Sequence, residues 1–410
     1  MINIREYSVE AMAEYITGYG DDGWIPVYIA DTFCNGRYEI INKLGFGSCA
    51  TVWAARDHHD NVDVSIKVIK AAYSLDNREL RILQHIQQGA DHPGRKYLPR
   101  LLNHFDVCLG GKKNLFIVLE LLGPPLSLVH YRPCTYTPTF SRRISQQILL
   151  AVDCLHSYGI VHGGNIHEGN VLFRLVEGFQ LPLQVVHQGR VYRKDGAPLE
   201  GGLPHQVVTP LWEGFWFDED LFREVGHIQL IDFSSSFFDS ETPTWIHTRG
   251  DRAPPELIFR KPLNKSVDVW SLACMVRDMD LTLGQESTTN AGSNQTFYVA
   301  TGRNLFETRR GGRRLLIAIH TVVGESSAQW LLKALFEAIV SSTWKDLGTY
   351  PFDYVSETVC ADVYLDLETE LIEEIGNPDR ALPQYIRQCL VVDPSKRATT
   401  SQLRDQEYVQ

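Results

Sequence analysis

The sequence has 410 residues, 44% hydrophobic and 22% charged, which is typical of a globular chain that buries a sizeable core. Its net charge of −11 argues against general nucleic-acid binding and against attraction to an anionic membrane surface, and it suits a basic partner. The eight cysteines include no C-x-x-C pair, so no zinc site is expected. With no signal-peptide pattern and no membrane-spanning run, we expect a cytoplasmic or nuclear protein that does not enter a membrane.

The first part of the chain predicts an antiparallel sheet with one helix. Residues 37–44 and 51–55 alternate as two strands around a glycine-containing turn, and residues 62–68 alternate as a third strand. Residues 74–87 predict a helix with one apolar face. Residues 115–122 predict a buried strand that a Gly-Pro-Pro segment ends. This part is therefore expected to form a small sheet-rich lobe.

The second part of the chain predicts mainly helices. The expected helices are 141–157, 267–281, 313–323, 327–340 and 381–391. Two stretches rich in turn-forming residues, 174–226 and 284–312, look like insertions. The expected organisation is an N-terminal extension at 1–35, a strand-rich lobe at 36–122 and a helical lobe at 123–408. The fold class expected from this order is α+β in two lobes.

Residues suited to holding a phosphate follow the first predicted strand. Gly45 and Gly47 lie on a strand–turn–strand, where a bare backbone can approach a phosphate closely. Val52 on the returning strand is placed to cover a base. Lys67 lies on the third strand, opposite its apolar face, and Glu79 on the following helix is its natural ion-pair partner. The turn alone is a weak signal, but the combination favours a nucleotide site.

A polar loop separates a predicted helix from a short apolar strand and reads VHGGNIHEGNVLF over residues 161–173. It resembles the catalytic loop of protein kinases, H-R-D-L-x-x-x-N. His162 opens the loop and Asn170 closes it, with one residue too many between them and no aspartate. Depending on where the extra residue is placed, the position of the catalytic Asp is held by Asn165 or by Gly164.

Further motifs in kinase order strengthen the resemblance. An apolar strand ends in Asp232, where Asp-Phe-Ser stands for Asp-Phe-Gly. The segment RAPPE, which ends at Glu256, resembles the A-P-E motif, and Arg397 resembles the distal arginine that pairs with its Glu. Asp268-Val-Trp resembles the start of the helix that supports the catalytic loop.

Within the protein kinases, the chain resembles the SR-protein kinases. Residues 24–31 (WIPVYIAD), the Gly-Arg-Tyr at 36–38 and the LGFGSCATVW that follows are similar to the start of that family's kinase domain. The insertion at 174–226 and the W-S-x-A-C-M helix at 270–275 also match its pattern. The resemblance covers roughly residues 20–405 and is greatest to the fungal SR-protein-kinase-like group.

The resemblance implies a two-lobed protein kinase that uses ATP and Mg²⁺ to phosphorylate Ser in basic Arg/Ser-rich proteins, as a monomer and without direct nucleic-acid contact. It assigns catalytic roles to Lys67 and Glu79 and to Asn165 at the catalytic Asp position, and it assigns Mg²⁺ to Asn170 and Asp232. The implied nucleotide contacts are Leu44, Gly45, Gly47, Val52, Lys67, Glu120 and Leu122.

Two other readings remain open at this point. Because an amide cannot take up the substrate proton as a carboxylate does, the protein is alternatively a pseudokinase that binds ATP or serves as a scaffold. The loop also resembles that of small-molecule kinases, which use H-G-D-x-H-x-x-N. The RAPPE segment and Arg397 argue against that last reading, since those enzymes lack a protein-substrate activation segment.

Overall fold

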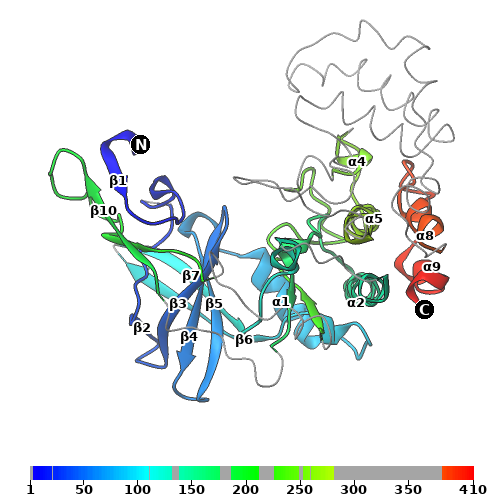
Figure 1. The fold of residues 1–410 in the computed structure, drawn as a ribbon, viewed down its shortest axis with the longest axis horizontal. Helices are drawn as coiled ribbons and strands as arrows, with labels where there is room; N and C mark the ends of the chain where they lie inside the picture. Colours follow the sequence, from blue (N-terminus) through cyan, green and yellow to red (C-terminus); the bar gives the residue numbers. More distant parts are fainter. Residues whose placement is uncertain are drawn as a thin grey trace, which may run out of the picture. The chain divides into compact units, whose positions relative to one another are not determined.

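The computed structural model describes residues 3–20, 22–109, 111–131, 138–175, 186–211, 226–248, 253–258, 260–280 and 381–410. Its contacts divide the chain into two compact units (Figure 1). The first unit comprises residues 1–88, 99–124 and 173–226, and the second comprises residues 89–98, 125–172 and 227–410. The insertion expected at 284–312 and the helices expected at 313–323 and 327–340 lie outside the described residues.

The first unit is built on a six-stranded antiparallel sheet in the order β2-β3-β4-β5-β7-β6. Its strands are β2 (Thr32–Phe33), β3 (Tyr38–Phe46), β4 (Ala50–Asp57), β5 (Val62–Ile69), β6 (Leu101–Leu109) and β7 (Lys112–Glu120). Alternation decides which face is buried: Val64, Ile66 and Val68 of β5 are at most 1% exposed, whereas the residues between them are half-buried.

Among the described residues of this unit, one α-helix is present, α1 (Arg78–Gln88), and its buried positions Ile82, Leu83 and Ile86 follow helical spacing. It begins later than expected from the sequence, because the Asn77 side chain accepts the Leu80 N–H over 2.9 Å and caps the helix there. The short helix η3 (Ala71–Tyr73) precedes it.

A second, smaller sheet in this unit joins segments that are far apart in the chain. It contains β1 (Tyr7–Val9), β10 (Gln188–Arg193) and β11 (Gln206–Val208), with Tyr7 opposite Arg193. Figure 1 shows β1 next to β10. Tyr7, Ile16, Tyr19, Trp24, Val191, Leu203 and Val207 form its core. The sequence places 174–226 as an insertion in the helical lobe, whereas the structure groups 173–226 with the first unit, because β10 pairs with β1.

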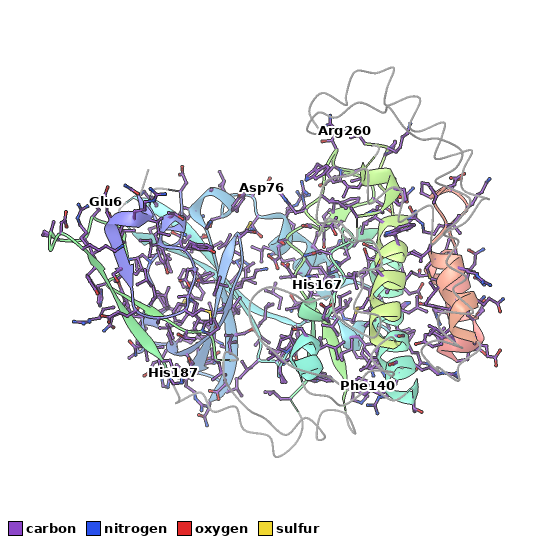
Figure 2. The ribbon with its side chains drawn as sticks, turned by 45° about the horizontal axis from the view of Figure 1, so that its top comes forward. Glu6, Asp76, Phe140, His167, His187 and Arg260 are labelled. Atoms are coloured by element: carbon purple, nitrogen blue, oxygen red, sulfur yellow. The ribbon has the colours of Figure 1, made fainter. Side chains whose placement is uncertain are left out.

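The second unit is mainly helical. Within the part of the unit that the structure describes, the α-helices are α2 (Pro138–Ser157), α4 (Pro255–Ile258), α5 (Ser266–Asp280), α8 (Ala381–Cys389) and α9 (Thr400–Arg404). Phe140, labelled in Figure 2, marks the start of α2, which packs against α5 and α9. Short strands complete the unit: β8 (Ile160–Val161) pairs with β13 (Phe237–Phe238), and β9 (Val171–Phe173) pairs with β12 (Ile228–Leu230).

The α+β class expected from the sequence is confirmed, with strands and α1 in one unit and mainly helices in the other. Among the described residues, no helix combines the length and the apolar character that a membrane crossing requires.

Candidate functional site

The register of the large sheet aligns three of the expected nucleotide residues in one row. Gly45 of β3 lies opposite Val52 of β4, and Val52 lies opposite Lys67 of β5. Directly opposed residues of antiparallel strands point to the same face. The glycine turn, the base-covering valine and the lysine therefore share one face of the sheet, and Leu44 lies half-buried beside them.

The two glycines of the β3–β4 turn leave the backbone uncovered. Neither has a positive φ, and a Cβ built on Gly45 or Gly47 would meet no atom within 4 Å. The turn is closed by the Gly47 N–H, which donates to the Ala50 carbonyl over 2.8 Å. The backbone conformation does not require glycine here; the absence of a side chain lets another group approach the strand.

Lys67 and Glu79 form the ion pair expected from the sequence. Nζ of Lys67 is 2.7 Å from Oε1 of Glu79, and the two side chains are 14% and 5% exposed. Glu79 lies in the first turn of α1, where the positive end of the helix dipole favours a carboxylate. The ion pair holds the lysine side chain in one place on the sheet.

The end of β7 and the residues just after it carry the last two expected nucleotide residues. Glu120 ends the strand, its Oε1 accepts the Arg100 N–H over 3.1 Å, and its carbonyl accepts the Ser65 hydroxyl over 3.2 Å. Leu122 is half-buried two residues later. Glu120 therefore lies on the strand next to the one that carries Lys67, and Leu122 follows that strand.

In the second unit, Asp268 organises the start of the polar loop. Its carboxylate accepts the consecutive backbone N–H groups of His162, Gly163 and Gly164 over 2.8, 2.9 and 2.8 Å, and it lies 2.9 Å from Nε2 of His156. Burial by itself would raise the pKa of Asp268, but the hydrogen bond from His156 and its charge hold the pKa below its ordinary value. The backbone at the start of the loop is therefore held by the buried carboxylate of Asp268.

Gly163 and Gly164 have a conformation that other residues rarely adopt. Their φ angles are +94° and +67°, and a Cβ on Gly163 would lie 2.4 Å from the Ser235 carbonyl oxygen. Further along the loop, the side-chain nitrogen of Asn170 donates to the Asn165 carbonyl over 3.0 Å. The tight glycine turn thus accommodates the extra residue, and Asn165 is the loop residue tied to Asn170.

Asp232 lies two residues after β12, the strand that pairs with β9, and β9 directly follows Asn170. The Ile231 N–H donates to the Asn170 carbonyl over 2.9 Å, which joins the two segments. Asp232 is half-buried and has a φ of +68°, a conformation that costs energy for a residue with a side chain and is often associated with functional sites.

The donor set suits Mg²⁺. Carboxylate and amide oxygens are hard ligands, and Mg²⁺ in phosphate-transfer sites takes only one or two ligands from protein. Among the described residues, no group of three or more His, Cys, Asp or Glu side chains is placed to hold a metal alone. Asp232 and Asn170 therefore fit a metal shared with phosphate, and they do not fit a closed protein cage.

The distal arginine forms the ion pair expected from the sequence. Both terminal nitrogens of Arg397 bond the Glu256 carboxylate, over 2.7 and 3.0 Å, and both side chains are fully buried. The guanidinium also lies 5.1 Å from the centre of the Trp270 ring. Arg252 of the same motif lies outside the described residues.

Sequence reasoning missed the role of His167, which is labelled in Figure 2. Its Nδ1 accepts the Gly169 N–H over 3.1 Å and caps the short helix η6 (Glu168–Asn170). An accepting Nδ1 carries no proton, so the neutral ring holds its proton on Nε2. A histidine two residues before a Gly is only a weak signal for such a cap.

Lys67 and Asp232 lie in different units, and their facing one another remains a prediction.

Comparisons with known proteins find similarity to protein kinases. Residues 38–181 match the protein kinase domain family. A serine/threonine protein kinase of Aspergillus fumigatus is 25% identical over 67% of this chain and 65% of its own length. Protein kinase dsk1 of Schizosaccharomyces pombe is 35% identical over 38% of this chain and 30% of its own length. The serine/threonine-protein kinase SRPK of Physarum polycephalum is 26% identical over 64% of each chain.

A solved structure supports the fold over almost the whole length. The crystal structure of a kinase domain superposes with a TM-score of 0.62 at 17% identity, covering 95% of this chain and 100% of the other. At that identity the likeness shows the fold, which is the two-lobed α+β fold of protein kinases. The chain matches about 65% of the length of the curated Aspergillus relative.

Proposed function

We propose that this chain is an ATP-dependent serine/threonine protein kinase similar to SR-protein kinases, because residues 38–181 match the protein kinase domain family and its relatives include protein kinase dsk1 and the kinase SRPK. It transfers the γ-phosphate of ATP to serine in Arg/Ser-rich proteins, at a rate lowered by Asn165. The observation that carries the proposal is the Lys67–Glu79 pair, in one row with Gly45 and Val52.

The first unit supplies the nucleotide contacts. Lys67, held by Glu79, offers its ammonium group to the phosphates, and the absence of side chains at Gly45 and Gly47 lets the phosphates approach the hairpin closely. Leu44 and Val52 cover the base from the hairpin, and the segment from Glu120 to Leu122 contacts its edge. These roles need one cation and an uncovered backbone, which the unit provides.

The second unit supplies the metal ligands. Asp232 and Asn170 hold Mg²⁺, which when bound neutralises the charge on the transferring phosphate. The loop around Asn165 places the substrate hydroxyl, because Asn170 fixes the Asn165 backbone. An asparagine at this position orients a hydroxyl by hydrogen bonding but accepts no proton, so the rate falls by roughly 10²- to 10⁴-fold.

The proposed substrate is a basic protein segment. The net charge of −11 favours association with cationic sequences, and the motifs at 24–31 and 270–275 are those in which the chain resembles SR-protein kinases. The protein is proposed to act as a monomer on such segments.

One observation favours a second function. Asn165 replaces the acid expected at the catalytic position, while Lys67, Glu79, Asn170 and Asp232 remain. On this second proposal, the chain binds Mg-ATP through these residues but does not transfer phosphate. It then acts through protein contacts, as a pseudokinase.

Two measurements on the whole chain separate these functions. The first is the unfolding temperature with ATP, with and without Mg²⁺, in the parent and in Asp232→Ala. Ligand at a hundred times its Kd stabilises the native state by about 2.7 kcal/mol. The second is phosphate transfer to an Arg/Ser peptide and to its Ser→Ala counterpart. A Mg-dependent shift with transfer supports the kinase, and a shift without transfer supports the pseudokinase. No shift at millimolar Mg-ATP contradicts both.

A further inference from the structure

A buried ion pair joins the N-terminal segment to the strand that leads into the glycine turn. Glu14 binds Nζ of Lys43 on β3, and the two side chains are 1% and 0% exposed. The Tyr19 hydroxyl donates to the same carboxylate. Lys43 is two residues before Gly45, and its Nζ lies 5.2 Å from the centre of the Trp53 ring. Sequence patterns did not indicate this pair.

The same N-terminal segment also holds the connection between Lys67 and Glu79. The carbonyls of Asp22 and Gly23 accept the N–H groups of Ala72 and Ala71, each over 3.0 Å. These two alanines belong to η3, which lies between the end of β5 and the start of α1. Nearby, Nζ of Lys70 lies 4.0 Å from the centre of the Trp24 ring.

Asn114 strengthens this second attachment from the neighbouring strand. Its side-chain nitrogen donates to the Gly23 carbonyl over 3.3 Å and to the Ile69 carbonyl over 2.8 Å. One amide thus links the N-terminal segment to the end of the strand that carries Lys67. Both ends of the segment 14–24 are therefore bonded to elements that carry proposed nucleotide residues.

Lys43 also contacts a chain segment that is distant in the sequence. The Leu211 N–H donates to the Lys43 carbonyl over 2.7 Å, so the backbone of β3 is held by the segment that follows β11, while its side chain is held by Glu14. A buried ion pair contributes little net stability against an apolar replacement, but its hydrogen bonds fix direction and register.

We propose that residues 14–20 and 22–24 are a built-in positioning element of the nucleotide site, which holds the glycine turn through Glu14–Lys43 and the Lys67–Glu79 pair through Asp22 and Gly23. This inference rests on the proposed function, because it assigns an effect on Mg-ATP affinity. The element acts through other residues and touches no reacting atom.

The test compares Glu14→Gln with Glu10→Gln in the whole chain. Glu10 lies four residues before Glu14, outside the proposed element, and pairs with Arg190 on the surface, where the side chains are 36% and 73% exposed, so it is the matched control. Hydrogen exchange of the nucleotide-free proteins is measured by peptide over residues 43–52, over residues 70–80 and over α2. The Kd for Mg-ATP is measured by calorimetry.

We expect Glu14→Gln to exchange at least fivefold faster over residues 43–52, with α2 unchanged, and to bind Mg-ATP at least fivefold more weakly. Glu10→Gln should match the parent in both. Parent-like exchange at 43–52 in a folded Glu14→Gln protein overturns the inference, as does uniformly faster exchange that includes α2. A parent that binds no Mg-ATP contradicts the proposed function instead, and the exchange data still decide the inference.

A second variant keeps the test decisive if Glu14→Gln does not fold. Glu14→Leu with Lys43→Met replaces both charges with apolar groups of similar volume, a change that buried ion pairs often tolerate. This protein lacks the directional bonds, so faster exchange at 43–52 and weaker Mg-ATP binding support the inference. Parent-like values in both measurements overturn it.

Discussion

The side-chain nitrogen of Asn170 donates to the backbone carbonyl of Asn165 over 3.0 Å, so a proposed Mg²⁺ ligand fixes the place of the residue at the proposed catalytic position. Because the bond uses the backbone of Asn165, it does not depend on the side chain there. Position 165 can therefore be changed to test the chemistry while the loop around it keeps its shape.

Changing Asn165→Asp should raise transfer of phosphate to an Arg/Ser peptide by at least tenfold, because a carboxylate accepts the substrate proton and a positioned base contributes ~10²–10⁴-fold. Mg-ATP affinity should change less than threefold. Gly164 is kept, since its N–H donates to Asp268. Asn165→Ala is the control and should stay at or below the parent rate. A folded Asn165→Asp protein that binds Mg-ATP but gains no activity would show that the amide is not the limiting defect.

Changing Lys67→Met should weaken Mg-ATP binding by at least tenfold, about 1.4 kcal/mol, because the cation held by Glu79 is lost from the phosphates. The matched control is Lys113→Met, which removes an exposed lysine that pairs with Asp106 in the same sheet. Calorimetric titration with Mg-ATP should give the control a Kd within twofold of the parent. Equal weakening in the two variants would argue against a specific role for Lys67.

Gly163→Ala should destabilise the second unit more than Gly159→Ala does. Both glycines have positive φ, which costs an alanine ~1–2 kcal/mol. An added Cβ at Gly163 would also lie 2.4 Å from a backbone oxygen, whereas at Gly159 the nearest atom is the Asp239 carboxylate at 3.2 Å. The extra crowding should cost about 1–3 kcal/mol, as measured by urea unfolding. Equal losses would mean that the loop relaxes around the added methyl.

Arg397→Leu should lower the free energy of unfolding by about 3–5 kcal/mol, because the Glu256 carboxylate would remain buried without its cation. Lys396→Leu, at a side chain that is 76% exposed, should change it by less than about 0.5 kcal/mol. Chemical denaturation followed by circular dichroism measures both. A loss below about 1 kcal/mol in Arg397→Leu would show that Glu256 finds another partner or is protonated.

Stability should depend on pH through His162. Burial lowers the pKa of this imidazole, although Asp268 and Asp232 oppose the effect. An unfolded histidine has a pKa near 6.5, so below that pH the unfolded chain binds more protons and the native state loses stability as the pH falls. Urea unfolding at about pH 7.5 and about pH 5.5 should show a smaller loss in His162→Leu than in the parent. His104→Leu, at an exposed histidine, should lose as much as the parent.

The sequence predicted the strands of the large sheet where one face is cleanly buried. Residues 37–44, 51–55 and 62–68 became β3, β4 and β5, because apolar residues alternate along them. It missed β6, where Leu102 and Cys108 lie on the exposed face and blur the alternation. Helix boundaries depended on local hydrogen bonds, such as the Asn77 cap of α1, that periodicity does not report.

The two ion pairs of the candidate site were predicted from motifs, because Lys67–Glu79 and Glu256–Arg397 use charged side chains that are visible in the sequence. The hydrogen bonds from three consecutive backbone N–H groups to Asp268 were not predicted, since every residue except proline has such a donor. The Glu14–Lys43 ion pair was not predicted either, because it forms between two segments that only the folded chain brings together.

The pairing of β1 with β10 has a consequence for synthesis of the protein. Tyr7 leaves the ribosome well before its partner Arg193, which is made only after the whole of α2. At roughly 5–20 residues per second, the N-terminal strand waits many seconds for that partner. The first unit therefore cannot complete its smaller sheet in chain order, and β1 leaves the ribosome as an unpaired strand edge. Slowed translation between β1 and β10 should lengthen that exposure and increase the need for chaperones.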